Sequence, residues 1–195
     1  MDRKQALSRI EEELTESCRV KQQFSRELKA QIAALAERIA STLAAGGVIY
    51  WIGNGGSAAD AQHLAAELVG RLRRSRKALA SVALTTNASL LTAVANDESY
   101  DEVFSRQVDA LMRPQDLLIA ISTSGQSESV LQAVALANER GVFTVGWTGE
   151  LGGSLAKLAQ LCLRVPSRDT QRIQEAHITI GHIVCGIVED MLVPE

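Results

Sequence analysis

The chain has 195 residues, 46% of them hydrophobic, and a formal net charge of −3. This length fits a single domain, and the apolar content excludes a disordered chain. The small negative charge provides no overall attraction to nucleic acid, so a nucleic-acid partner would require a local basic patch.

The first part of the chain predicts two helices that precede the rest of the fold. Residues 2–45 contain no glycine or proline and are rich in alanine, leucine and charged residues. Leu7, Ile10 and Leu14 follow the spacing of one helix face, and the same spacing recurs further along. We expect the break between the two helices near residues 24–27. Because the first helix is charged around much of its circumference, its apolar stripe is expected to pack against another subunit.

From residue 46 the pattern changes to short apolar segments that alternate with helical stretches. The candidate strands are 48–52, 78–84, 116–122, 143–147 and 161–165. The candidate helices are at about 57–70, 88–95, 101–112, 127–139, 151–159 and 171–192. This alternation predicts an α/β fold with a doubly wound parallel five-stranded sheet flanked by helices. We expect one domain over 1–195, with N-terminal helices in 1–45 and an α/β core in 46–195.

The loop after the first predicted strand has the sequence GNGGSA. Its Gly53, Gly55 and Ala58 fit the G-x-G-x-x-A pattern of dinucleotide-binding turns. Such a site also needs an acidic residue at the end of the second strand, or an arginine for NADP. That strand ends in ALTTN at 83–87, which carries no charge. We therefore disfavour a dinucleotide site at this loop.

The loop after the third predicted strand has the sequence ISTSGQS and leads into a helix. Four hydroxyl groups surround Gly125, those of Ser122, Thr123, Ser124 and Ser127. The N-terminus of a helix offers unpaired N–H groups and partial positive charge, which hydroxyl groups complete into a phosphate cradle. The loop contains no lysine, so a small phosphomonoester fits it better than a nucleoside triphosphate. In the alternative interpretation one serine only caps the helix, which leaves three hydroxyl groups without a role.

The three histidines lie in two predicted helices. His63 and Glu67 are four residues apart and therefore share one helix face. In the last helix Gln174 and His182 project to roughly the same side. His177 is turned away from Gln174, so it either supports the site residues from behind or packs in the core. An isolated His–Glu pair is usually a surface pair. Together the two clusters indicate a shared metal site or acid–base site.

The segment RLRRSRK at 71–77 is strongly basic, because five of its seven residues are arginine or lysine. For most of these residues a solvated loop is the simplest interpretation. Arg71 follows Glu67 by one helical turn, so it could assist the binding of an anionic sugar.

The sequence also bears on where the protein acts. No uninterrupted apolar run reaches the ~18 residues of a membrane span, and the first residues lack the apolar core of a signal peptide. The three cysteines are far apart and form no C-x-x-C pair, as expected of buried thiols in a reducing compartment. We expect a soluble cytoplasmic protein that contacts no membrane.

Five motifs occur in order along the chain, and together they resemble one family. These are GNGGS, H-x-x-x-E, VANDE, ISTSG-x-S and RIQE-x-H-x-x-x-x-H. The chain is similar over essentially its whole length to the phosphoheptose isomerases, which belong to the sugar isomerase (SIS) domain group. The glycine and STSG loops are shared by SIS domains in general, whereas the His–Glu pair and the RIQE segment are more selective.

The resemblance implies an aldose–ketose isomerase that converts sedoheptulose 7-phosphate to D-glycero-D-manno-heptose 7-phosphate. The family reaction is the first step toward the heptose of bacterial lipopolysaccharide. By position, Glu67 matches the general base and His182 the general acid. The residues that match the zinc site are His63, Glu67, Gln174 and His182. Those that match substrate contacts are Asn54, Gly55, Gly56, Ser57, Glu67, Asn96, Asp97, Ser122, Thr123, Ser124, Ser127 and Gln174.

The resemblance also implies partners. It indicates a homotetramer with about one Zn²⁺ per subunit, a small phosphorylated sugar as substrate, and no nucleic acid. A related scaffold, the DnaA initiator-associating protein, has the same fold but lacks equivalents of Glu67 and His182, so we favour the enzyme. Amino-sugar SIS proteins are a third alternative, but they typically carry paired SIS domains, and this chain has room for one.

Overall fold

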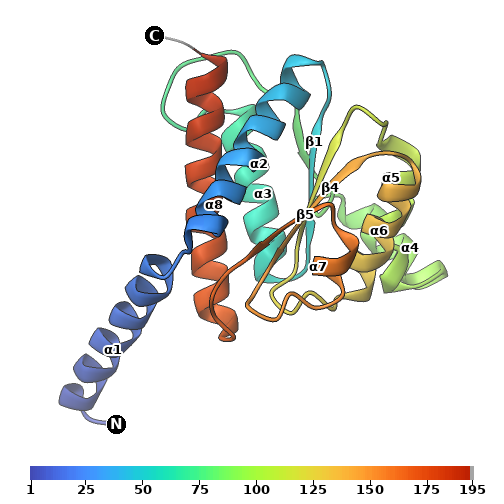
Figure 1. Cartoon of the computed structure of the whole chain (residues 1–195). Helices are drawn as coiled ribbons and strands as arrows, with labels where there is room; N and C mark the ends of the chain where they lie inside the picture. Colours follow the sequence, from blue (N-terminus) through green and yellow to red (C-terminus); the bar gives the residue numbers. More distant parts are fainter. Residues whose placement is uncertain (194–195) are drawn as a thin grey trace.

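The computed structural model describes residues 1–193, in which five parallel strands form the central sheet (Figure 1). The strands are β1 (Ile49–Gly53), β2 (Ser81–Ala83), β3 (Leu117–Ile121), β4 (Phe143–Thr148) and β5 (Leu161–Arg164). They lie in the order β2-β1-β3-β4-β5, and every neighbouring pair is parallel. All residues of β1 and β3 are buried, as expected of strands covered on both faces. The predicted doubly wound α/β fold is confirmed.

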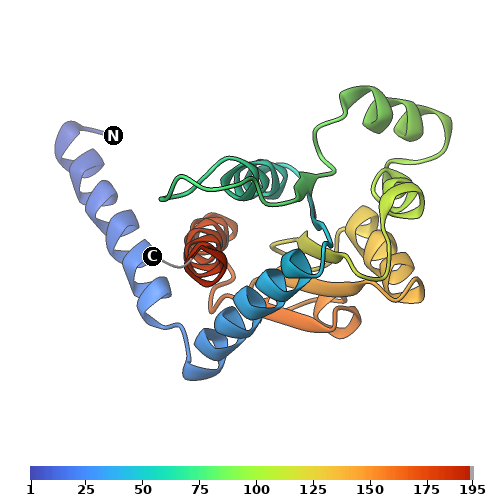
Figure 2. The same ribbon diagram turned by 90° about the horizontal axis from the view of Figure 1, so that it is seen from above.

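Helices cover both faces of this sheet. The α-helices are α1 (Arg3–Gln22), α2 (Arg26–Ala44), α3 (Gly56–Val69), α4 (Ala88–Asp97), α5 (Ser105–Leu111), α6 (Glu128–Glu139), α7 (Leu155–Leu158) and α8 (Thr170–Leu192), with a 3-10 turn η1 (Tyr100–Glu102). One face of the sheet carries α2, α3 and α8, and the other carries α5, α6 and α7, each group with its own hydrophobic cluster (Figure 2). Among the described residues, no helix is both long and apolar enough to cross a membrane.

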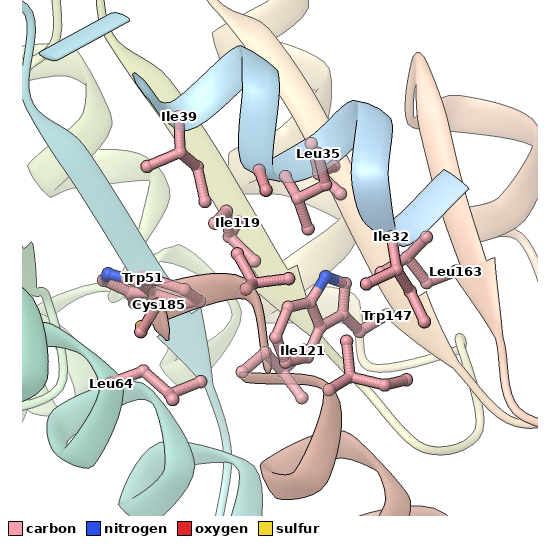
Figure 3. Packing of buried hydrophobic residues seen from close by; sticks show 14 of the residues in the cluster. Ile32, Leu35, Ile39, Trp51, Leu64, Ile119, Ile121, Trp147, Leu163 and Cys185 are labelled. Atoms are coloured by element: carbon pink, nitrogen blue, oxygen red, sulfur yellow. The ribbon is translucent and has the colours of Figure 1, made fainter. Parts of the chain in front are cut away.

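The larger hydrophobic cluster lies between the sheet and helices α2, α3 and α8. Trp51 on β1 and Trp147 on β4 meet edge to face, with ring centroids 5.9 Å apart, and Ile39 and Leu64 complete the same cluster (Figure 3). The indole N–H of Trp51 donates a hydrogen bond to Ser81 Oγ at 2.9 Å, so its one polar atom is satisfied. This core holds α3 and α8, which carry the predicted histidine clusters, against the same face of the sheet.

The second strand is shorter than the pattern of 78–84 predicts. Only Ser81–Ala83 pair with β1. The N–H of Leu79 instead donates to the carbonyl oxygen of Leu68 at 3.1 Å. The beginning of this apolar segment therefore closes the end of α3, and the strand starts only after that contact.

Two predicted helices also differ from their patterns. The stretch 151–159 contains only the short helix α7, because Gly152 and Gly153 adopt φ values of +74° and +59°, which an α-helix does not allow. The stretch 101–112 is divided into η1 and α5. The residues at 149–154 therefore form a loop, which lies at the carboxyl ends of the strands.

The N-terminal helices form as predicted, and α1 projects away from the body of the protein (Figures 1 and 2). Ser25 is the N-cap of α2, its hydroxyl accepting a hydrogen bond from the N–H of Leu28. The break therefore falls next to the predicted position. In α1 the side chains of Leu7, Ile10 and Leu14 are 56%, 53% and 63% exposed, so the apolar stripe of this helix is uncovered in the single chain.

Candidate functional site

The predicted site loops meet at the point where the winding of the sheet reverses. β1 and β3 are adjacent, and Gly53 at the end of β1 is in register with Ile121 at the end of β3. From β1 the chain passes into α3 on one face, and from β3 it passes into α6 on the other. A parallel sheet of this kind opens a crevice at such a switch point, outside the carboxyl ends of the strands. The glycine loop and the serine loop therefore border one crevice.

The glycine loop makes a tight turn at the start of α3. Gly55 is its N-cap and adopts φ +55°, a left-handed conformation that glycine accommodates at little cost. A Cβ atom on Gly56 would lie 2.5 Å from the amide nitrogen of Gln174, so the glycine lets the end of that side chain rest against the loop. Ser57 is buried in the first turn of α3. The glycines thus bring Gln174 of α8 against the N-terminus of α3.

Asn54 connects the glycine loop to two other elements. Its amide nitrogen donates to Ser129 Oγ at 3.0 Å, and its carbonyl oxygen accepts from the hydroxyl of Tyr100 at 2.8 Å. Tyr100 begins η1, shortly after Asn96 and Asp97 at the end of α4. The amide of Asn96 donates to the carboxylate of Asp97 at 2.7 Å. The contact of Tyr100, which the sequence analysis missed, ties the VANDE segment to the glycine loop.

The serine loop leads directly into α6. Ser127 occupies the N-cap position, but its hydroxyl is engaged with Ser122 Oγ at 3.1 Å. Ser124 Oγ accepts a hydrogen bond from the N–H of Gln126 at 3.2 Å, and Ser124 is exposed. A helix cap therefore does not account for this group of hydroxyls. They surround a helix N-terminus whose N–H groups and dipole favour an anion.

A cavity of about 530 Å³ opens beside Thr123 and Ser124. Its remaining wall comes from the loop at 149–154 and from the beginning of α8, including Ile173. Lys157, Arg168 and Glu150 also line it, and Arg168 is paired with Glu150 at 2.8 Å, so Lys157 is the lining cation that this ion pair leaves over. Its volume is in the range of small-ligand sites.

The two predicted histidine clusters meet where α3 lies against α8. His63 Nε2 is 2.8 Å from His182 Nε2 and 3.3 Å from Glu67 Oε1. One donor atom of each of these three side chains lies within 4.8 Å of the others. A Cβ atom on Gly181 would overlap the side chain of Leu64, so only glycine lets the helices approach this closely. Gly181 precedes His182 and Leu64 follows His63, and this packing therefore brings the two imidazoles together.

This donor set fits a metal ion such as Zn²⁺. Two imidazoles and a carboxylate are ligands that zinc accepts. With Zn–N bonds of about 2.0–2.1 Å in tetrahedral geometry, two ligand nitrogens lie about 3.3 Å apart. The 2.8 Å between the two imidazole nitrogens would have to lengthen by roughly half an ångström, which side-chain rotation can supply.

Gln174 is the fourth predicted ligand, and it lies elsewhere along the helix pair. Its amide contacts Gly56, which is seven residues before His63 and hence about 10 Å away along the helix axis. This position is beside the glycine loop, among the predicted substrate contacts. The metal-binding role of Gln174 stays a prediction, and its location favours the substrate contact.

Asp60 is a further side chain that the sequence analysis missed. It precedes His63 by three residues and therefore shares the face of α3 that carries His63 and Glu67. Burial raises the pKa of its carboxyl group to about 6, although the nearby His63 works in the opposite direction. Within residues 1–193 its Oδ2 atom is buried without a hydrogen-bond partner. The D-x-x-H spacing could have revealed its position but not its burial.

His177 belongs to the core and not to this site. Its ring is fully buried beside Trp147, with centroids 5.9 Å apart, and its Nε2 is 3.3 Å from the carbonyl oxygen of Thr148. Burial lowers the pKa of His177 from 6.5 to about 4. Of the two roles that the sequence left open for this residue, the structure favours packing.

We expect His177 to make the protein less stable in acid. Because its pKa is about 4 when folded and 6.5 when exposed, the unfolded chain binds more protons between these values. The free energy of unfolding should therefore fall as pH drops through this window, by about 2 kcal/mol between pH 7 and pH 5. Urea unfolding of the protein and of a His177→Gln variant at both pH values isolates this contribution. Parallel pH dependences in the two proteins would contradict it.

The basic segment at 71–77 is not a uniformly solvated loop. The side chain of Arg76 is only 2% exposed and pairs with Glu189 of α8 at 2.8 Å. Arg71 and Lys77 are exposed. The interpretation as a solvated loop is therefore wrong for Arg76, because a buried carboxylate on α8 provides its partner.

Comparisons with known proteins agree with this architecture. A family model described as SIS domain matches residues 14–149. The phosphoheptose isomerase of Roseiflexus sp. (strain RS-1) is 52% identical over 184 residues, which are 94% of this chain and 93% of that protein. That of Rhodospirillum rubrum is 55% identical over 161 residues, 83% of this chain and 86% of that protein.

Solved structures give the same result. The structure of a phosphoheptose isomerase from Neisseria gonorrhoeae matches with a TM-score of 0.90 and 42% identity, covering 95% of this chain and 99% of that one. A phosphoheptose isomerase from Francisella tularensis matches with a TM-score of 0.91 and 34% identity, covering 95% and 98%. With this identity over nearly all of its length, the chain belongs to the SIS domain family, among the phosphoheptose isomerases, and is an isomerase.

Proposed function

We propose that this isomerase interconverts sedoheptulose 7-phosphate and D-glycero-D-manno-heptose 7-phosphate, the first step toward the heptose of lipopolysaccharide. The observation that carries the proposal is the meeting of Glu67 and His182 where α3 lies against α8, in a chain whose serine loop offers a hydroxyl-rich helix N-terminus. The names of the relatives point to the same substrate class.

The reaction moves a carbonyl group between carbon 2 and carbon 1 of the sugar. One proton leaves carbon 1 of the ketose, an enediol forms, and a proton is delivered to carbon 2. Glu67 is the base that takes and returns the proton on carbon. His182 is the acid that protonates the carbonyl oxygen on carbon 2 as the enediol forms, and it then takes the hydroxyl proton from the oxygen on carbon 1 as the aldehyde forms. A carboxylate and an imidazole suit these roles because each can exchange protons near neutral pH when it is correctly placed.

A zinc ion would be held by His63, Glu67 and His182. Gln174, which the family resemblance implies as a fourth ligand, contacts the glycine loop at Gly56 and is assigned here to the substrate. When bound, it would polarise the oxygen atoms that change between carbonyl and hydroxyl. Glu67 has two carboxylate oxygens, so one can serve as a ligand while the other faces the proton on carbon. The close packing of Gly181 against Leu64 supports the site by holding both imidazoles at one position.

The phosphate end of the sugar would bind at the serine loop. The hydroxyls of Ser122, Thr123, Ser124 and Ser127 and the N–H groups at the start of α6 offer donors to a phosphate dianion. The proposed contacts along the sugar chain are Asn54, Gly55, Gly56, Ser57, Asn96, Asp97 and Gln174. Binding at this far end orients the substrate and leaves the proton transfers to Glu67 and His182.

The functional unit we propose is a homotetramer in the cytoplasm with about one zinc per subunit. The exposed apolar stripe on α1 supports assembly, because such a stripe on a projecting helix is usually covered by a partner. Within the chain, Arg172 donates to the carbonyl oxygen of Glu13 and so holds α1 against α8 near Gln174, which fixes the direction in which the stripe is presented. The three cysteines are unpaired, in keeping with a reducing compartment. Light scattering tests the assembly, and a stable active monomer would contradict it.

The scaffold alternative receives less support. A protein that only binds other proteins does not need a carboxylate and an imidazole brought together by glycine-dependent helix packing. Both groups are present here and meet, with one donor atom of each within 4.8 Å of the other.

An isomerase assay tests the proposal directly. We expect purified protein with added Zn²⁺ to convert sedoheptulose 7-phosphate to an aldoheptose 7-phosphate. Chromatography of the sugar phosphates measures the conversion. Unphosphorylated sedoheptulose is the matched control, and it should react far more slowly because the serine loop then binds nothing. Lack of turnover with the phosphorylated ketose in folded, metal-replete protein would rule the proposal out.

A further inference from the structure

The buried ion pair between Arg76 and Glu189 lies outside the site described above. It joins the basic segment after α3 to α8, and both side chains are only 2% exposed. Buried charges are rare unless their hydrogen bonds are satisfied, because removal of a charge from water is costly. The contacts of each partner therefore indicate what the pair holds in place.

Glu189 gathers the chain that follows α3. One carboxylate oxygen accepts from the N–H groups of Arg73 and Arg74, at 2.9 and 3.2 Å. The other accepts from Arg76 Nε at 2.8 Å and from the N–H of Leu72 at 3.4 Å. Burial alone would raise the pKa of Glu189, but these hydrogen bonds hold it below the ordinary value. The carboxylate is thus a charged anchor on α8 for residues 72–76.

Arg76 uses its other nitrogens on the end of α3. One terminal nitrogen donates to the carbonyl oxygen of Glu67 and the other to that of Leu68, both at 2.8 Å. The last carbonyls of a helix have no partner within the helix, so the guanidinium group acts as a C-terminal cap with favourable charge. One of the capped carbonyls belongs to the residue proposed as the catalytic base.

The same pair is aligned with His182. Glu189 follows His182 by seven residues, which is two helical turns, so both lie on the same face of α8. Cys185 lies between them on this face. Burial raises the pKa of its thiol to about 12, and the nearby charges of Glu67, Arg76 and Glu189 also act on it. The site and the ion pair are therefore neighbours in space as well as along α8.

We propose that Arg76 is a positioning residue, which with Glu189 fixes Glu67 on α3 relative to His182 on α8. This inference rests on the proposed function, in which Glu67 and His182 act on the same substrate. Arginine is needed because its planar fork reaches the Glu189 carboxylate and two carbonyls at once, whereas the single nitrogen of lysine cannot span them. Small errors in the placement of reacting groups lower the rate more than they lower substrate binding.

The test compares Arg76→Lys with a matched control, Arg74→Lys. Arg74 belongs to the same segment and also pairs with α8, at Asp190, but it does not contact Glu67. For Arg76→Lys we expect kcat about tenfold lower, KM within twofold, and Zn²⁺ affinity of the full chain about tenfold weaker, the usual scale for outer-shell changes. Arg74→Lys should keep all three values. Circular dichroism at the assay temperature checks that both variants are folded.

A second variant covers the case in which Arg76→Lys fails to fold. In Arg76→Met/Glu189→Gln both charges are removed together, so no unpaired charge stays buried, while the single carbonyl oxygen of glutamine can still accept from the N–H groups of Arg73 and Arg74. The same losses in kcat and Zn²⁺ affinity are expected. Wild-type kcat and Zn²⁺ affinity in a folded Arg76 variant, or an equal loss in Arg74→Lys, would overturn the proposal.

The two readouts separate this inference from the proposed function. Zn²⁺ affinity, measured by competition with a chromophoric chelator, needs no substrate. If the wild-type protein binds Zn²⁺ but does not isomerise the heptose phosphate, the proposed substrate is wrong, and the affinity comparison still decides the role of Arg76. If Zn²⁺ does not bind but turnover occurs, the ratio of the kcat values decides it.

Discussion

Replacement of Glu67 by glutamine is expected to lower kcat for the heptose phosphate at least ~100-fold, the usual scale for loss of a general base. Glutamine keeps the shape of the side chain but has no basic oxygen to accept the proton from carbon. KM should change little, because the phosphate is bound at the serine loop. Steady-state kinetics with saturating Zn²⁺ measures both constants.

Two measurements make this result specific. The zinc content of the variant shows whether glutamine still supports the metal, so that loss of the base is distinguished from loss of a ligand. Glu37→Gln, at an exposed position on α2, is the control for removal of a carboxylate and should keep wild-type kcat. Near-normal turnover by Glu67→Gln would refute the assignment of Glu67 as base.

The fold could be predicted because its determinants are local. The alternation of apolar strands with helices, and the absence of glycine and proline from 2–45, are properties of short windows. One error arose where a contact with another element decided the outcome, and the other arose from the local conformation of glycines. The segment 78–84 yields part of its length to the end of α3 through Leu79, and 151–159 is interrupted by glycines in left-handed conformations.

The candidate site could be predicted only in halves. The i, i+4 pair of His63 and Glu67 is visible in the sequence, and so is His182, but the distance between them is not. That distance depends on Gly181 against Leu64, a contact between helices more than 100 residues apart in the chain. Only the family resemblance predicted that these residues share one site, because members of a family have the same fold and therefore the same contacts between distant motifs.

The roles of Arg76 and His177 could not be predicted because they depend on charge and burial together. Arg76 lies in a run of basic residues, and such residues are usually exposed to solvent. The burial of Arg76 is favourable only because the fold places Glu189 beside it. His177 resembles the other two histidines in composition, yet its ring lies in the core beside Trp147. The sequence shows which side chains can titrate, whereas the fold determines which of them are exposed to solvent.

Substitution of either His63 or His182 by alanine is expected to abolish stoichiometric zinc binding. Metal-replete protein should contain about one zinc per chain, and each variant should lose most of it after dialysis. Each substitution removes one of the two imidazoles of the donor set, and a tetrahedral site that loses a neutral nitrogen ligand binds its ion far more weakly. Acidification should release the metal as well, because a protonated imidazole has no lone pair to coordinate it.

The third histidine provides the control for this experiment. His177→Gln removes an imidazole from the core, where it contacts Thr148 and Trp147, and should keep the full zinc content in folded protein. Elemental analysis of the three variants after identical dialysis gives the comparison without any activity measurement. Full zinc content in both His63→Ala and His182→Ala would remove the site from this helix pair. Zinc lost equally from all three would show that the metal depends on the stability of the fold and not on these two ligands.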